Sequence, residues 1–200
     1  MFNAIPRILL AALLMVPPLC AVDPKCNAGT LPVVTIYINE KINLALYERA
    51  RAIFVATRAF REIGVQLTWR EGSVSQEPES PACNPAGVIE LQVDQAADAS
   101  EPPDVLAYAT PASNSGARIH VFHDRVAGFS AQVPNLLGYV LAHEIAHVLQ
   151  GIARHSDDGI LKARWIGRDY NRMGTFSLSF SREDAEIIGF HLGRRHGVTE

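Results

Sequence analysis

The hydrophobic residues of this chain follow two periods, one typical of strands and one typical of helices. Segment 33–38, VVTIYI, is β-branched and aromatic, and 65–70, VQLTWR, alternates between apolar and polar residues. Both patterns are typical of β-strands. Three later segments have the same character: 88–93 (VIELQV), 105–110 (VLAYAT) and 117–122 (ARIHVF). The chain therefore predicts a sheet of about five strands.

Two segments have apolar residues at helical spacing. Residues 44–64, LALYERARAIFVATRAFREIG, predict a long amphipathic helix that ends at Gly64. Residues 136–150, LLGYVLAHEIAHVLQ, have a wide apolar face, and Gly151 follows where a C-terminal cap belongs. This second helix is expected to be buried, although it carries polar residues.

A third helix is expected close to the C-terminus. Ser181 and Asp184 have the spacing of a capping pair, and the apolar run 185–193 follows them. The order of strand, helix, several strands, helix and helix predicts an α+β domain with a mixed, twisted sheet. The helix at 44–64 would back the sheet, with the helices at 136–150 and near the C-terminus beside it.

The first residues resemble a secretory signal peptide. Arg7 precedes the apolar run ILLAALLMV, which a proline pair and small residues follow. We expect residues 1–21 to be removed and 22–200 to form one secreted or periplasmic domain, because 200 residues with 48% hydrophobic content suit one core. An uncleaved N-terminal anchor is the alternative.

Removal of residues 1–21 would leave two cysteines, Cys26 and Cys83, in an oxidising compartment, and we expect a disulfide between them. Two free thiols are the alternative. The mature chain would have 17 basic and 21 acidic residues, which gives no indication of nucleic-acid binding. We expect a monomer without a membrane partner.

The helix at 136–150 contains the pattern HExxH. His143 and His147 are four residues apart, so both imidazoles project from one face and can bind one zinc ion. Glu144 lies about 100° further round the helix, beside such a metal. A carboxylate there can accept a proton from a metal-activated water. The alternative is that the three residues are ordinary buried polar side chains. In that case each of them needs a hydrogen-bond partner inside the protein.

A catalytic zinc ion usually has three protein ligands and one open position. Gly151 lets the chain reverse, and His155 follows within reach of the same ion, so we expect His155 to be the third ligand. Four acidic residues are the alternatives for this position: Asp157, Asp158, Glu183 and Glu186.

The run HEIAHVLQGIARH, residues 143–155, resembles the extended zinc signature of the metzincin metallopeptidases. It departs from that signature, in which the glycine stands one residue earlier and the third histidine two residues earlier. The resemblance implies the zincin fold, a bound zinc ion and peptide-bond hydrolysis. It also implies that Glu144 acts as the general base and that an antiparallel edge strand, 105–110 or 117–122, binds a polypeptide substrate.

The next segment, SDDGILKARW, is similar to a group of secreted bacterial zincin-like proteins that have methionine at the position of Leu161. In metzincins a methionine turn lies beneath the metal, so either Leu161 or Met173 is expected there. Tyr108 and Tyr170 are considered as oxyanion donors, although a packing role is the simpler interpretation.

Two further functions compete with a peptidase. One is a secreted zincin-fold module that binds metal or protein without turnover, and the other is an interaction domain in which HExxH is accidental. His120 and His123 are three residues apart on an expected strand, on opposite faces, so we interpret both as structural or surface residues.

Overall fold

The computed structural model describes residues 31–40, 44–74, 85–98, 101–113, 116–128 and 133–195. The strands are β1 (Val33–Glu40), β2 (Gln66–Glu71), β3 (Pro85–Asp94), β4 (Ala107–Ser113) and β5 (Gly116–Phe122). The helices are α1 (Leu46–Glu62), α2 (His123–Ala127), α3 (Val133–Gln150), α4 (Gly167–Gly174) and α5 (Arg182–Arg195). The five strands and three long helices expected from the sequence are therefore confirmed, with shifts of a few residues at their ends.

The strands form one mixed sheet in the order β2-β1-β3-β5-β4. All neighbours are parallel except β4, which lies at one edge and runs antiparallel to β5. The α+β fold class and the mixed five-stranded sheet are confirmed. Of the two segments considered for the antiparallel edge, the one at 105–110 occupies it and the one at 117–122 does not.

Alternation along the central strands separates a helix-covered face from a polar face. Ile36 pairs with Ile89, and Leu91 pairs with Ile119, so apolar side chains line up on the face that packs against the helices. The intervening residues of β3, Glu90 and Gln92, are polar. One sheet face therefore supplies the core.

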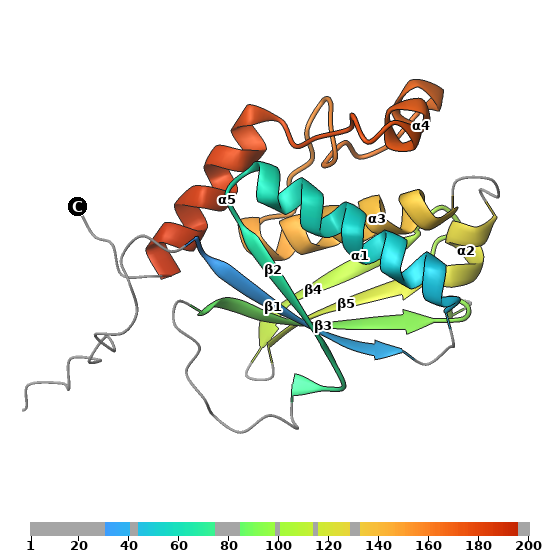
Figure 1. Cartoon of the computed structure of the whole chain (residues 1–200), viewed down its shortest axis with the longest axis horizontal. Coiled ribbons are helices and arrows are strands. Elements are labelled where there is room, and N and C mark those ends of the chain that lie inside the picture. The colour runs from blue at the N-terminus through green and yellow to red at the C-terminus, as the bar shows by residue number, and fades with distance from the viewer. Residues whose placement is uncertain are drawn as a thin grey trace, which may run out of the picture.

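Helices α1 and α3 lie side by side over the apolar face, with α4 and α5 beyond them (Figure 1). The two helices approach closely at Gly138 of α3. A Cβ atom there would lie 2.5 Å from Cβ of Val55 and 2.8 Å from the carbonyl oxygen of Ala52, both on α1. Only a residue without a side chain permits this distance between the backbones, and α3 is thereby held against α1 along its length.

Two short helices, α2 and α4, were not expected from the sequence. The segment at 117–122 was interpreted as a strand that continues through His123, but the chain turns into α2 at that residue. The guanidinium of Arg125 on α2 donates to the carbonyl oxygens of Glu101, Pro102 and Val105. These bonds hold the segment before β4, which explains why that strand begins at Ala107 rather than at 105.

The third long helix begins as its capping pair predicts. The Ser181 hydroxyl accepts a hydrogen bond from the Asp184 N–H at 3.1 Å, and the Asp184 carboxylate accepts one from the Ser181 N–H at 3.2 Å. This reciprocal pair satisfies two backbone donors that would otherwise lack partners at the start of α5. The sequence thus predicted both the helix and its cap.

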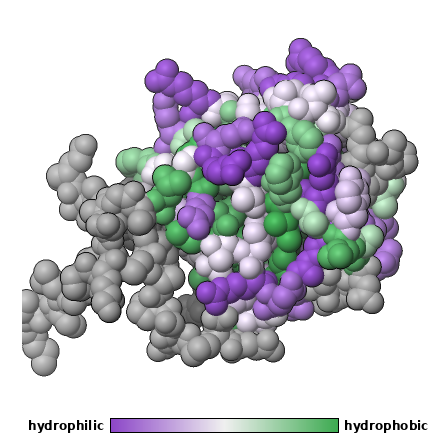
Figure 2. Space-filling model, viewed as in Figure 1, coloured by the Kyte–Doolittle hydropathy of each residue, from purple (hydrophilic) through white to green (hydrophobic). Residues whose placement is uncertain are grey.

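Hydrophilic and hydrophobic residues are interspersed on the molecular face seen in Figure 2. Within the ranges that the structure describes, no helix is both long and apolar enough to cross a bilayer. The expected signal peptide, 1–21, and both cysteines of the expected disulfide, Cys26 and Cys83, lie outside the described residues.

Candidate metal centre

The first two candidate ligands project from the face of α3 that turns away from the core of the sheet. Ile145, Ala146 and Leu149 of the same helix are fully buried, whereas His143 and His147 are partly exposed. The two Nε2 atoms are 3.0 Å apart. Two ring nitrogens at this distance need a hydrogen on one of them or a cation between them.

The chain then brings His155 back to this pair. Helix α3 ends at Gln150, Gly151 follows with φ 66°, and the loop turns over the helix end. The ring of His155 lies with its centroid 5.3 Å from that of His143 and 4.8 Å from that of His147. One ligand atom from each of the three histidines lies within 4.8 Å of the others. The structure thus brings together the three histidines singled out in the sequence.

A main-chain carbonyl orients His143. Its Nδ1 lies 2.8 Å from the carbonyl oxygen of Ile160, which can only accept, so Nδ1 carries the hydrogen and Nε2 presents its lone pair to the other histidines. The Ile160 N–H donates in turn to Ser179 at 3.0 Å. Gly159, with φ 84°, makes this possible, because a Cβ there would lie 2.5 Å from the Ser179 carbonyl oxygen.

The segment after His155 supplies the surroundings of His143. The Trp165 ring meets the His143 ring edge to face, with centroids 5.5 Å apart, and its Nε1–H donates to the Gly159 carbonyl at 3.3 Å. Leu161, which is fully buried, follows Ile160 directly. The segment of Leu161 therefore lies against His143.

Met173, the other residue considered beneath the metal, lies elsewhere. Its carbonyl oxygen accepts a hydrogen bond from the Asn135 side chain at 3.2 Å. Asn135 precedes His143 by eight residues, or about 12 Å along the helix axis. Met173 therefore packs near the start of α3, far from the three histidines.

Two of the histidines, His143 and His147, have lowered pKa values and are neutral at physiological pH. Burial and the charge of His147 lower the pKa of His143 to about 3, against the opposing effect of the Ile160 carbonyl. Burial and the charge of His155 also lower the pKa of His147. Neutral imidazole is the form that binds metal.

The three side chains fit a zinc ion. Zinc-bound nitrogens lie about 2.0–2.1 Å from the metal, and hence about 3.3 Å apart in a tetrahedral site. The pair at 3.0 Å is already close to this separation. A ring nitrogen of the exposed His155 lies within 4.8 Å of the ligand atoms of this pair.

Glu144 is buried beside this cluster, with 8% of its surface exposed. Burial alone raises the pKa of its carboxyl group to about 7. A carboxylate with a pKa near neutrality is suited to accept and return a proton. A buried carboxyl group with a raised pKa therefore follows the first candidate ligand, His143, in α3.

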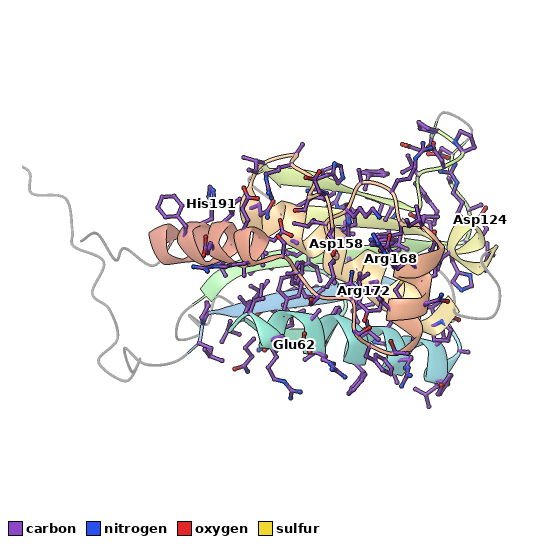
Figure 3. All side chains as sticks on the ribbon, turned by 90° about the horizontal axis from the view of Figure 1, so that it is seen from above. Glu62, Asp124, Asp158, Arg168, Arg172 and His191 are labelled. Carbon is purple, nitrogen blue, oxygen red and sulfur yellow. The ribbon has the colours of Figure 1, made fainter. Side chains whose placement is uncertain are left out.

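The acidic residues considered for the third ligand position have other partners. Three of them form ion pairs: Asp158 with Arg172, Glu183 with Arg154 and Glu186 with Arg182. Arg172 belongs to α4, and Asp158 lies near it (Figure 3). The remaining acid, Asp157, is exposed and does not belong to the three-histidine group.

Sequence reasoning missed Ile160 and Trp165 as neighbours of His143, and it treated Asp184 only as a cap. Burial raises the pKa of Asp184, but hydrogen bonds from Ser156, Ser181 and Arg154 outweigh burial and hold that pKa below its ordinary value. No local pattern in the sequence reports the contact of Ser156 with Asp184 or that of His143 with Ile160, since these residues are 28 and 17 positions apart.

Other residues weighed in the sequence lie apart from the cluster. His120 contacts Asp94, whereas His123 contacts Glu48 at 2.8 Å. His123 begins α2, so the reason given for separating the two histidines was wrong, although their separate partners agree with structural roles. Tyr108 stacks on His120 with centroids 4.9 Å apart, which agrees with packing.

No protein-family model matches the chain, and no curated protein matches it either. Among solved structures, the crystal structure of archaemetzincin from Methanopyrus kandleri is similar to it, with a TM-score of 0.50. The two chains are 13% identical, and the match covers 84% of this chain and 99% of that one. The likeness shows that this chain has an archaemetzincin-like fold, which confirms the zincin-like architecture expected from the sequence.

The raised pKa of Glu144 predicts a pH-dependent effect of Glu144→Gln on the metal-free protein. Between its ordinary pKa of 4.5 and about 7, the folded state holds a proton that the unfolded state has lost. Glu144 therefore costs stability as pH rises toward 7, by about 3 kcal/mol at most. Glu144→Gln removes this cost.

The gain in unfolding free energy from Glu144→Gln should accordingly grow from pH 5 to pH 8. Chemical denaturation of both proteins at each pH measures it. Contributions of His143 and His147 cancel in the comparison, and a gain that stays constant with pH would contradict the buried, raised carboxyl group.

Proposed function

We propose that this chain is a zinc-dependent endopeptidase, with His143, His147 and His155 as metal ligands and Glu144 as general base. One observation supports it most: three histidines converge on one point, and the buried Glu144, whose pKa is raised to about 7, follows the first of them in α3. The archaemetzincin-like fold agrees with the proposal, because it is the fold that the zinc signature implies.

His143, His147 and His155 would hold a zinc ion, which would supply Lewis-acid polarisation of the scissile carbonyl and lower the pKa of a water. Glu144 accepts the proton of the attacking water and delivers it to the leaving amine. Its low exposure keeps water from solvating the carboxylate, which maintains its basicity near neutral pH. The hydrogen bond from His143 to Ile160 holds that ligand in one tautomer throughout.

The edge strand β4 offers a main-chain template for an extended peptide. The Phe122 N–H donates to the Leu106 carbonyl at 3.0 Å, so residues of even number on β4 exchange hydrogen bonds with β5. The N–H and C=O groups of Ala107 and Ala109 consequently point to the open edge. An extended substrate can pair with these groups whatever its side chains are.

Pro111 limits this template. It is the next odd-numbered residue of β4 after Ala109, so its main-chain groups also belong to the open edge. Proline has no N–H to offer there, which agrees with its place on an edge strand. The regular pairing of β4 with β5 also breaks after Thr110. We therefore propose that the substrate pairs with Ala107 and Ala109 and no further along the strand.

Zinc binding tests the ligand set. The purified chain should hold about one zinc ion, and His155→Ala should hold markedly less, because two imidazoles remain of three. Elemental mass spectrometry of both proteins measures this. Zinc absent from both proteins would overturn the proposed function.

Glu144→Gln separates metal binding from turnover. This variant should keep its zinc, since Glu144 is not a ligand, and lose nearly all peptide cleavage, on the order of a thousandfold or more. Cleavage of a peptide library, followed by mass spectrometry, measures the loss. If the parent chain binds zinc and cleaves nothing, the zincin-fold binding module is the better assignment, which the longer ligand loop and Leu161 would then explain.

Ala109→Pro tests the edge strand. It removes an N–H that points to the open edge and not to β5, so one substrate hydrogen bond is lost while the zinc content stays unchanged. We expect kcat/KM to fall about tenfold. Ala109→Gly keeps the N–H and serves as the matched control, and equal kcat/KM values for the two variants would show that the substrate does not pair there.

A further inference from the structure

The loop that carries His155 is attached to one buried carboxylate. Arg154 donates from Nη1 to Oδ1 of Asp184 at 2.8 Å, and the Ser156 hydroxyl donates to the same oxygen. These two residues stand on either side of His155. Asp184 therefore holds the residue before His155 and the residue after it, and this fixes where the backbone of His155 lies.

Asp184 is itself held rigidly. Its side chain is fully buried, and its second oxygen, Oδ2, accepts the Ser181 N–H at the start of α5. Ile188 and Leu192, further along α5, are buried in the core with residues of α3. The two carboxylate oxygens thus divide their contacts, since Oδ1 binds the loop and Oδ2 binds the helix start.

Contacts on the other side of the loop are consistent with this arrangement. The Ser156 N–H donates to the Leu161 carbonyl at 2.8 Å, and Arg154 also pairs with Glu183. His155 itself is exposed, so packing contributes little to its position. Its place depends on the contacts that its neighbours Arg154 and Ser156 make.

We propose that Asp184 is a positioning residue for His155, acting through Arg154 and Ser156 to hold the third imidazole where the other two converge. The proposal rests on the proposed function, because it takes His155 as a ligand. A loop two residues longer than the metzincin signature has more conformations to lose, and a charged anchor on both sides of the histidine removes them before metal binds.

Asp184→Asn is the informative variant. Asparagine has the same shape but only one acceptor oxygen, which cannot serve both the loop and the Ser181 N–H, and it has no charge for Arg154. We expect its Zn²⁺ affinity to fall about 10-fold to 100-fold, the usual effect of losing a group that orients a metal ligand. Competition with a chromophoric chelator measures the affinity.

A double-mutant cycle separates positioning from general destabilisation. In the His155→Ala background, Asp184→Asn should cause no further loss of Zn²⁺ affinity, because the residue that it positions is gone. An equal loss in both backgrounds would overturn the proposal. Ser156→Ala, which leaves Asp184 and the helix start intact, should give a smaller loss of the same kind.

A measurement without metal completes the test. Hydrogen exchange of the metal-free protein should show faster exchange over 152–158 in Asp184→Asn, with α3 unchanged. Glu186→Gln, which breaks an exposed ion pair with Arg182 on the same helix, is the matched control and should alter neither exchange nor affinity. If the parent chain binds Zn²⁺ tightly and Asp184→Asn does likewise, this proposal fails while the proposed function stands. A parent chain without Zn²⁺ affinity would overturn both.

Discussion

The structure depends on how a buried helix accommodates polar side chains in its middle. Helix α3 packs against α1 through Gly138 and against the sheet through its apolar residues, and it still carries two histidines and a glutamate on successive turns. Burying such groups without partners is costly. The loop after the helix provides contacts for the two histidines: it folds back so that the Ile160 carbonyl meets His143 and so that His155 meets both histidines.

Burial also sets the charge states of His143 and Glu144. Burial acts in opposite directions on the two kinds of group, lowering the pKa of His143 and raising that of Glu144. Neutral imidazoles and an acid near its midpoint at neutral pH are the states that metal binding and proton transfer require. The same low exposure that makes these side chains expensive to bury therefore shifts their pKa values toward the states that the proposed function requires.

Elements with long periodic patterns could be predicted from the sequence, as could the pair His143 and His147, because helical spacing alone puts both on one face. The cap formed by Ser181 and Asp184 could also be predicted, since the two residues are only three positions apart. Helix α2 was missed because it is five residues long and continues directly from β5.

The contacts that orient the cluster could not be read from the sequence. Asp184 meets Ser156, and His143 meets Ile160, only after the chain has folded, and neither pair leaves a periodic trace. Contacts of main-chain groups are harder still to predict from the sequence, because every residue has a carbonyl oxygen. Sequence reasoning therefore found the three histidines that the structure brings together and missed the residues that contact them or the loop of His155.

The position of Leu161 illustrates a last consequence of main-chain support. What orients His143 is the carbonyl of Ile160, which any residue can supply, and the ring that packs on His143 belongs to Trp165. The residue at 161 is fully buried and thus needs only to be apolar and of suitable volume. Leucine in place of methionine is compatible with the same arrangement, whereas Gly159 is constrained by a clash with the Ser179 backbone. Substitution at this turn is therefore restricted at Gly159, where a side chain would collide with the backbone, and is less restricted at Leu161, where another apolar side chain of similar volume fits.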